Sequence, residues 1–511
     1  MPSVPTDSSP AAETKQADAG WHDRASYAVA FGVIAFFLVT SLWISLKRLF
    51  WYDELMTFQI AGIPDSSTFW AAIHRGFDGM PPAYYLLERF LLAHIHPAEL
   101  ALRLPSVLAV SFGTFVVFDC ARRLTDAFFG LFGMGVVLVS YIAYYSYEAR
   151  SYALYFLCSA LALWVWCHAR GRLGPVLFGA CFFAGMMMHD YFFICLTPYA
   201  LYECLQWRPG RWPSAKLIGG AVGLLCGILV LAPQLAAQHA FNTIFWAIPT
   251  LGLLVNVYGT SLPFGVAIFC LAAAWLALVR KPSPAPKIEA ATSAEAVGWF
   301  HLLIPLAGYI VAKFVTHAFY DRYFICFVPG MAVALACFSY RNLQAWSIPA
   351  IGALIVVIGL GMGDQSRFAA HPEMVDPTRH TLDNDQIRTT EFMKLEDRIK
   401  TDGKRSVLIC EPMMYSQVRH YSKAHLNYFF LSGPSNPRQK FNSMLLKALN
   451  DYVPQGLWAI RDLEQNAAGA AVVDMPPEAL EALRADGYRP TLAFKIDHGF
   501  LHPIEIAYLQ R

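Results

Sequence analysis

The residues with the clearest capacity for chemistry are carboxylates and arginines in short, aromatic-rich stretches. Asp53 and Glu54 follow the first long apolar segment in WYDELMTFQIAG, and Glu148 and Arg150 lie in YYSYEARSY. A partly desolvated carboxylate is suited to act as a general base, and a guanidinium is a permanent, forked cation suited to a phosphate. Because neighbouring helical residues point about 100° apart, we expect Asp53 to be the base and Glu54 to be its supporter or a packing polar residue.

Further candidate residues occur in three other polar stretches of the chain. In HAFYDRYF, Arg322 and Tyr323 are candidate donors to a phosphate. Asp78 in FDGMPPAYY and His189 in HDY form a candidate pair of ligands for a divalent metal ion. Two ligands without a spacing constraint are a weak signal, so the metal stays an open alternative.

Each of these clusters also has a purely structural explanation. Carboxylates favour the first turn of a helix by under about 1 kcal/mol, charged neighbours form interfacial ion pairs, and a proline pair ends one helix and begins the next. These explanations stay open for the Asp53–Glu54 helix start, the Glu148–Arg150 pair, the His189–Asp190 span end, the Asp321–Arg322 pair, and Pro81 and Pro82, which would hold Asp78 rigidly.

The composition places these residues in an integral membrane protein. Of 511 residues, 56% are hydrophobic and 15% are charged, and the mean hydropathy is +0.40. The net charge is only +2, and the sequence contains no Walker loop, dinucleotide fingerprint or CxxC pair. Nucleic acid, a nucleotide cofactor and redox chemistry are therefore not expected. Of the eleven cysteines only Cys410 lies outside the apolar part of the chain, which argues against a disulfide framework.

Apolar stretches of roughly 20 residues predict about eleven transmembrane helices. Lys and Arg gather in alternate loops, which the positive-inside rule assigns to the cytoplasm, although Lys47 and Arg48 fall on the other side. The N-terminus is therefore expected in the cytoplasm, and the chain is expected in the inner (plasma) membrane. The predicted spans lie near 27–46, 101–121, 127–145, 152–168, 174–189, 191–206, 217–235, 256–279, 298–315, 323–340 and 346–362.

The chain is expected to have three parts. Residues 1–25 are polar and rich in Pro, Ala and Ser, which is typical of a disordered tail. Residues 26–362 form an all-α polytopic membrane domain, whose outer segment 47–100 contains amphipathic stretches typical of interfacial helices. Residues 363–511 drop in hydropathy and mix strand-like and helix-like stretches, which predicts a small soluble α/β domain on the outer face.

This topology tests whether the candidate residues can belong to one site. Asp53, Asp78, Arg150, His189 and Arg322 all fall at outer ends of the predicted spans or in the outer segment. The inner loops carry scattered Arg and Lys instead. The sequence therefore predicts a polar cavity that faces the outer side of the membrane.

The order of the pieces resembles a known family. A DE pair follows the first span, PPAYYLL comes about 25 residues later, LRLPSVLAV opens the second span, and YYSYEARSYAL opens the fourth. This order resembles the polyprenyl-phosphate-sugar-dependent glycosyltransferases of the C superfamily, especially family 39 and the bacterial group of aminoarabinose and rhizobial galacturonosyl transferases. The resemblance is specific over about 27–205, looser at 321–330, and not evident in 363–511.

The resemblance implies an inverting transfer of a sugar from a polyprenyl-phosphate donor to a glycan, lipid or protein acceptor on the outer face. It implies that Asp53 is the base, Asp78 the acidic residue before the prolines, and His189 the outer-face histidine of the family. FDGMPP lacks the lysine of the F-E-K-P-P form and has one more residue before the prolines, so phosphate binding is left to the arginines and Tyr323.

Two other classes of protein are alternatives. A transporter or flippase of lipid-linked or small solutes would carry ionisable residues at mid-span depth and broken spans in repeated halves. Here the charges lie at outer span ends and no internal repeat is seen. A scaffold that displays the outer domain would need none of these side chains for activity, and an Asp53→Asn variant would distinguish it from an enzyme.

Overall fold

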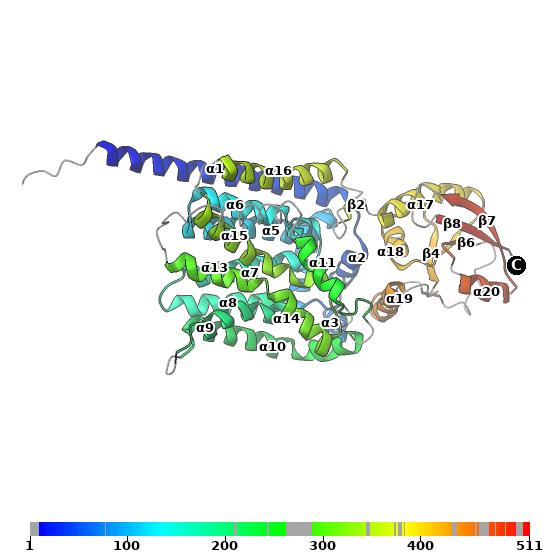
Figure 1. Cartoon of the computed structure of the whole chain (residues 1–511). Helices are drawn as coiled ribbons and strands as arrows, with labels where there is room; N and C mark the ends of the chain where they lie inside the picture. Colours follow the sequence, from blue (N-terminus) through cyan, green and yellow to red (C-terminus); the bar gives the residue numbers. More distant parts are fainter. Residues whose placement is uncertain are drawn as a thin grey trace, which may run out of the picture.

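A computed structural model gives the architecture of the chain (Figure 1). The structure describes residues 10–76, 78–208, 212–242, 245–261, 289–343, 348–371, 375–376, 381–382, 384–431, 437–454, 457–458, 470–475, 477–485, 487–496 and 504–510. Within these ranges a large helical body is joined to a smaller α/β domain at one end, as the sequence predicts (Figure 1).

The helical body consists of helices of different lengths that lie side by side (Figure 1). Its outward faces are rich in exposed apolar side chains such as Leu229, which is 66% exposed, as expected for a surface that meets lipid. α1 and α16 pack together at one edge, and α8 and α10 at the other. The helices are α1 (Pro10–Lys47), α5 (Ala98–Leu124), α6 (Ala127–Val139), α7 (Tyr152–His168), α8 (Leu173–Met188), α9 (Thr197–Leu205), α10 (Ala215–Asn242), α11 (Leu251–Ser261), α13 (Glu289–His301), α14 (Ile304–Val311), α15 (Val328–Asn342) and α16 (Ile348–Ala370).

The α8–α10 pair in this body packs closely because small residues line the crossing. A Cβ added at Gly179 would lie 2.6 Å from the backbone oxygen of Gly219, and one added at Gly223 would lie 2.0 Å from that of Gly179. Glycines at such crossings let two backbones approach, which is a common device for packing helices in membranes.

Six described helical segments are long and apolar enough to cross a membrane, and a seventh is obtained if one bent pair is counted as a single span. The bent pair is α6 with η1 (Tyr141–Tyr147), which meet at 66°. Other predicted spans, such as 152–168 and 174–189, form helices of 17 and 16 residues. The span near 256–279 lies mostly outside the described residues, so the count of about eleven is not confirmed.

The N-terminal tail differs from the expectation. The first helix begins at Pro10 rather than near residue 27, so residues 10–24, expected to be disordered, are helical. The stretch AAETKQADA is rich in alanine, glutamate, lysine and glutamine, whose intrinsic helix propensities are high. Low hydropathy in that stretch was therefore a poor guide to its backbone.

The outer segment 47–100 folds into three short helices whose ends follow from local sequence. They are α2 (Tyr52–Ala61), α3 (Ser66–Arg75) and α4 (Pro82–His94). The Asp65 carboxylate caps α3 by accepting from Thr68 N at 2.7 Å, and Gly76 ends it with a φ of 71°, which favours glycine. Pro82 occupies the first turn of α4, where its missing N–H costs nothing.

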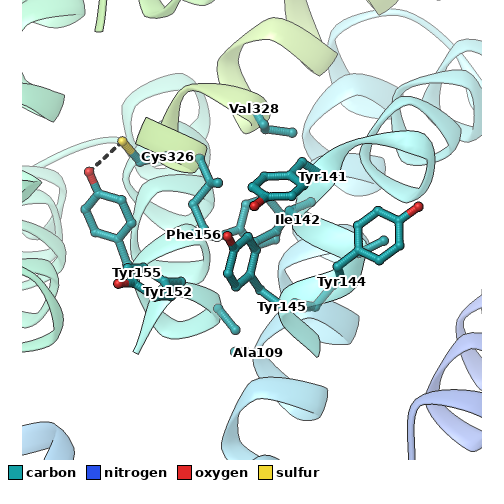
Figure 2. Packing of buried hydrophobic residues seen from close by; sticks show 14 of the residues in the cluster. Ala109, Tyr141, Ile142, Tyr144, Tyr145, Tyr152, Tyr155, Phe156, Cys326 and Val328 are labelled. Carbon is teal, nitrogen blue, oxygen red and sulfur yellow. Dashed lines mark hydrogen bonds between the residues drawn. The ribbon is translucent and has the colours of Figure 1, made fainter. Parts of the chain in front are cut away.

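Tight non-α turns bring the predicted polar clusters to one end of the body. They are η1 (Tyr141–Tyr147), η2 (Asp190–Leu196), η3 (Ala312–Thr316) and η4 (Asp321–Phe327). Arg150 follows η1, His189 directly precedes η2, and Arg322 lies in η4. Tyrosine rings pack between these turns and the neighbouring helices (Figure 2). The Cys326 thiol donates to the Tyr155 oxygen at 2.7 Å (Figure 2). The Tyr155 hydroxyl donates to the backbone oxygen of Tyr323 at 3.0 Å, so these two bonds tie η4 to α7.

The C-terminal domain is built on a six-stranded sheet of order β5-β4-β3-β6-β8-β7. The first four strands are parallel, and β8 and β7 pair antiparallel at the end. The strands are β3 (Ser406–Ile409), β4 (Asn427–Leu431), β5 (Leu457–Trp458), β6 (Ala471–Val473), β7 (Arg489–Ile496) and β8 (Ile504–Gln510), the helices are α17 (Asn384–Thr401), α18 (Pro412–Tyr421), α19 (Pro437–Asn450) and α20 (Pro477–Ala485), and β1 (Val375–Asp376) and β2 (Thr381–Leu382) form a separate pair.

The C-terminal domain is hydrogen-bonded to the segment that leads into α2. The Phe50 backbone N–H donates to the Tyr421 hydroxyl at 2.8 Å, and its backbone oxygen accepts from Gln417 Nε2 at 2.9 Å. The Tyr52 hydroxyl donates to the backbone oxygen of Asn442 at 2.6 Å. α18 and α19 therefore hold the chain on both sides of Trp51, directly before Asp53.

Candidate active site

A cavity of about 460 Å³ lies where the outer segment, the tight turns and α19 meet. Asp53, Asp78, Arg150, His189, Arg322 and Tyr323, six of the candidate residues, all line it. The rest of the lining comes from the start of α2, α8, η2, α10, η3, the stretch 245–246, the residue before η4, and α19. These elements contribute Trp51, Tyr52, Met186, Phe193, Ile228, Leu235, Phe245, Trp246, Val315, Tyr320, Phe441, Asn442 and Leu445. The predicted outer clusters thus come together around one cavity.

Asp53 is paired with Arg322 inside this cavity. Arg322 Nη2 lies 2.9 Å from Asp53 Oδ2, and the two side chains are 11% and 20% exposed. The Arg322 guanidinium lies over the rings of Trp51, Tyr152 and Tyr320, at 5.2, 5.4 and 4.8 Å from their centroids. Aromatic faces attract a cation, so this cage fixes the guanidinium while it leaves hydrogen-bonding edges for an anion.

Arg150 holds the second carboxylate of the cavity. Its Nη1 and Nη2 lie 3.1 and 3.0 Å from the two oxygens of Asp78, a bidentate arrangement, and the Tyr85 hydroxyl also donates to this carboxylate. Arg150 Nη1 also lies 3.3 Å from the backbone oxygen of Asp53 and 3.2 Å from Thr57 Oγ1. Arg150 therefore links the loop before α4 to the first turns of α2.

Glu54 has a different environment from its neighbour Asp53. It is fully buried, does not line the cavity, and forms a bidentate pair with Arg103, with both N–O distances at 2.7 Å. Its oxygens also accept from Ala149 N at 2.7 Å and from Trp51 N at 3.1 Å. The pKa of Glu54 is lowered from its ordinary value. Burial alone would raise this pKa, but the positive charge and hydrogen bonds of Arg103 have the larger effect. Glu54 thus acts as an ionised structural anchor for α2.

Arg103 is the important residue of this region that sequence reasoning missed. Besides Glu54, its guanidinium donates to the backbone oxygens of Ser45, Arg48 and Leu49 at 2.7, 2.7 and 3.0 Å. The available signal was an arginine near the start of an apolar span, where a charge needs buried partners. Arg103 fixes the end of α1 against α2 and so sets the direction in which Asp53 points.

Glu148 lies behind the cavity rather than in it. Its side chain is fully buried and is not among the lining residues. Burial raises the pKa of Glu148 to about 8, which the positive charge of Arg48 partly opposes. Glu148 is therefore a buried carboxylate next to the site, and a supporting role for it stays a prediction.

The candidate metal ligands do not form a recognisable metal site. Asp78 and His189 both line the cavity, but the Asp78 carboxylate already binds Arg150 and Tyr85, and His189 Nδ1 accepts from Tyr191 N at 3.2 Å and lies 3.2 Å from Asp190 Oδ1. Within the described ranges no group of three or more His, Cys, Asp or Glu side chains is placed to hold a metal ion. This donor set does not fit a resident metal.

Comparison with known proteins supports the resemblance seen in the sequence. Residues 79–237 match the family model described as dolichyl-phosphate-mannose-protein mannosyltransferase. ArnT from Cupriavidus metallidurans in the apo state has the same fold, with a TM-score of 0.59 and 13% identity over 95% of this chain and 98% of that chain. Residues 79–237 therefore resemble this family in sequence, and the chain as a whole has the fold of ArnT. The resemblance predicted from the order of motifs is confirmed.

A second solved structure extends the comparison. ArnT from Cupriavidus metallidurans bound to undecaprenyl phosphate matches this chain with a TM-score of 0.56 and 13% identity, over 96% of this chain and 98% of that chain. The coverage includes the C-terminal domain, where the sequence alone gave no resemblance. A sequence search of curated proteins finds no match to this chain.

Proposed function

We propose that this membrane protein is a glycosyltransferase, which moves a sugar from a polyprenyl-phosphate donor to a hydroxyl of a glycan, lipid or protein acceptor on the outer face of the inner membrane. The observation that carries the proposal is the Asp53–Arg322 pair inside a cavity that also has an apolar arm. That arm contains Met186, Phe193, Ile228, Leu235 and Val315. It suits a prenyl chain, and the arginines suit its phosphate.

The direction of the donor's approach is supported by the outer faces of the helices that form the apolar arm. Ile228 on α10 is 37% exposed and its neighbour Leu229 is 66% exposed, and Val315 on η3 is 59% exposed. Apolar side chains that are exposed both to the cavity and to the helix surface suit a lipid that diffuses laterally in the bilayer. Undecaprenyl phosphate bound to ArnT, which has the same fold, agrees with a donor of this class.

Asp53 is proposed as the general base and Arg322 as the main phosphate ligand. In an inverting transfer, the acceptor oxygen forms a bond to the anomeric carbon while the bond from that carbon to the phosphate oxygen breaks. The bonding electrons leave with the phosphate monoester, whose growing negative charge Arg322 stabilises from its aromatic cage. The acceptor proton passes to Asp53 Oδ2, and such general-base assistance is typically worth about 10²–10⁴-fold in rate.

Arg150 and Tyr323 complete the proposed donor site. Arg150 holds Asp78 and the start of α2 in place, and its charge adds to that of Arg322 in the cavity. Tyr323 stacks on Tyr191 with ring centroids 5.4 Å apart, which keeps it beside Arg322 as a wall of the phosphate site. Asp78 and His189 serve here as partners within the protein, and no step requires a metal ion.

The test is binding of undecaprenyl phosphate by the purified protein in lipid nanodiscs. Wild type should bind the lipid, and Arg322→Ala should weaken binding at least tenfold because the cavity loses its caged cation. Arg367→Ala removes an exposed arginine at the end of α16 and should change nothing. Equal affinity of wild type and a folded Arg322→Ala variant would refute the assignment of the phosphate site.

A further inference from the structure

We infer that α19 of the C-terminal domain, with the stretch 245–246, forms a subsite for the acceptor, which presents a carbohydrate ring to Asp53. This inference rests on the proposed sugar transfer and assigns a role to the C-terminal domain. The subsite is lined by Phe245, Trp246, Tyr320, Phe441, Asn442 and Leu445.

Two parts of the cavity lining differ in chemistry. The part formed by α8, η2, α10 and η3 carries Met186, Phe193, Ile228, Leu235 and Val315, together with the polar Gln238, His239 and Thr316. The side formed by 245–246, Tyr320 and α19 is mainly aromatic instead. A prenyl chain needs only an apolar channel, so a second wall of flat rings beside the base calls for another occupant.

The aromatic side chains form a connected row from the C-terminal domain to the base. Phe441 on α19 meets Phe245 edge-on, with centroids 5.2 Å apart, and Phe245 lies 5.7 Å from Trp246. Trp246 in turn meets Tyr320 at 5.4 Å, and Tyr320 lies against the guanidinium of Arg322, which holds Asp53. The row therefore leads directly to the carboxylate that must receive the acceptor proton.

The chemistry of the row fits a sugar ring. The C–H groups on one face of a pyranose pack against aromatic faces, which carry the negative part of the ring quadrupole. Polar atoms lie at the edges of the row, in the Tyr320 hydroxyl, the Trp246 indole and the Asn442 amide, and such groups bind sugar hydroxyls. None of the six side chains is ionisable near neutral pH, so the subsite is suited to an uncharged ring.

The position of α19 is fixed relative to the base. The Tyr52 hydroxyl donates to the backbone oxygen of Asn442 at 2.6 Å, and Asn442 is buried. Tyr52 directly precedes Asp53, so one hydrogen bond joins the acceptor wall to the residue beside the base. An acceptor ring that rests on Phe441 is thereby held at a defined distance from Asp53.

The test is photo-crosslinking in cells, because it captures the natural acceptor whatever its identity. p-Benzoylphenylalanine is introduced at Phe441 or Trp246 for the subsite, at Phe193 for the donor arm, and at the exposed Lys447 of α19 as the matched control. After irradiation, the purified adducts are analysed by mass spectrometry for carbohydrate and for polyprenyl phosphate. Melting temperatures establish that each variant is folded, and the Trp246 position decides if the Phe441 variant does not fold.

The expected result is a carbohydrate-containing adduct without polyprenyl phosphate at 441 and 246, a polyprenyl-phosphate adduct at 193, and neither at 447. If 193 captures polyprenyl phosphate while the folded subsite variants capture no such carbohydrate, the acceptor subsite is refuted and the proposed function stands. If 193 captures no polyprenyl phosphate, the proposed function itself fails.

Discussion

Replacing Asp53 with asparagine should abolish sugar transfer and, at the same time, strengthen binding of the donor lipid. In the structure Arg322 is held by Asp53 at 2.9 Å, and the donor phosphate needs the same guanidinium. The two anions therefore compete, and the phosphate must displace the base from its partner. An asparagine side chain cannot take up the proton of the acceptor hydroxyl. It also carries no negative charge, so it competes less with the donor phosphate for Arg322.

The size of the effect follows from the geometry of the pair. Two unit charges about 4 Å apart attract by about 4 kcal/mol at an effective dielectric constant of about 20. The side chains are 11% and 20% exposed, and asparagine still accepts a hydrogen bond, so only part of this attraction is lost. A gain of about 1.4–2.7 kcal/mol in phosphate binding is expected, which is a ten- to hundredfold lower Kd.

The assay titrates undecaprenyl phosphate into wild type and Asp53→Asn protein in nanodiscs, and measures transfer separately. Asp364→Asn is the control, since Asp364 is an exposed carboxylate on α16. Transfer by Asp53→Asn should fall at least a hundredfold, in line with the loss of a general base. Unchanged or weaker lipid binding by a folded Asp53→Asn protein would show that base and phosphate do not share Arg322.

Three further variants test the surroundings of the site. Glu54→Gln breaks the buried pair with Arg103 and should lower the free energy of unfolding by about 3–5 kcal/mol, seen as a lower melting temperature; an unchanged value would contradict the anchor role. Tyr421→Phe removes the acceptor of the Phe50 N–H, so transfer should fall severalfold while the Kd for undecaprenyl phosphate stays constant; a parallel loss of lipid binding would argue for general damage instead. Burial raises the pKa of Glu148 from 4.5 to about 8, so the unfolded chain releases this proton first, and the stability that protonated Glu148 contributes is lost as pH rises from about 4.5 to about 8. Glu148→Gln should show a flatter dependence of melting temperature on pH over that window, and an identical slope would refute the assignment.

The sequence predicts which residues meet, but not how they pair. The positive-inside rule places Asp53, Asp78, Arg150 and Arg322 on one side of the membrane, and the structure gathers them around one cavity. Arg322 and Asp53 pair across 269 positions of the chain. Their pairing depends on how the helices pack against one another, which the sequence does not specify. The sequence alone does not distinguish this pairing from the alternative in which Arg322 pairs with its neighbour Asp321.

Hydropathy and residue periodicity do not predict the role of Arg103 or the contribution of α19 to the cavity. Arg103 lies in a largely apolar helix, where hydropathy averaging hides a single charge that is neutralised by Glu54. The cavity wall from α19 comes from a domain that hydropathy separates from the membrane part. Contacts such as the hydrogen bonds at Phe50 and Tyr52 and the packing of Phe441 on Phe245 join the two. β3, β6 and β7 lie within the strand-like stretches that the sequence predicts in 363–511, since short apolar runs bounded by polar turns are typical of strands.

The most direct test of the central claim compares cells that make wild-type protein with cells that make the same amount of Asp53→Asn. Their envelope glycans, lipids and polyprenyl-phosphate sugars are measured by mass spectrometry. The account predicts that the Asp53→Asn cells lose one sugar from an acceptor and accumulate the corresponding polyprenyl-phosphate-linked sugar. Identical sugar contents and identical polyprenyl-phosphate sugars in the two cultures would contradict it.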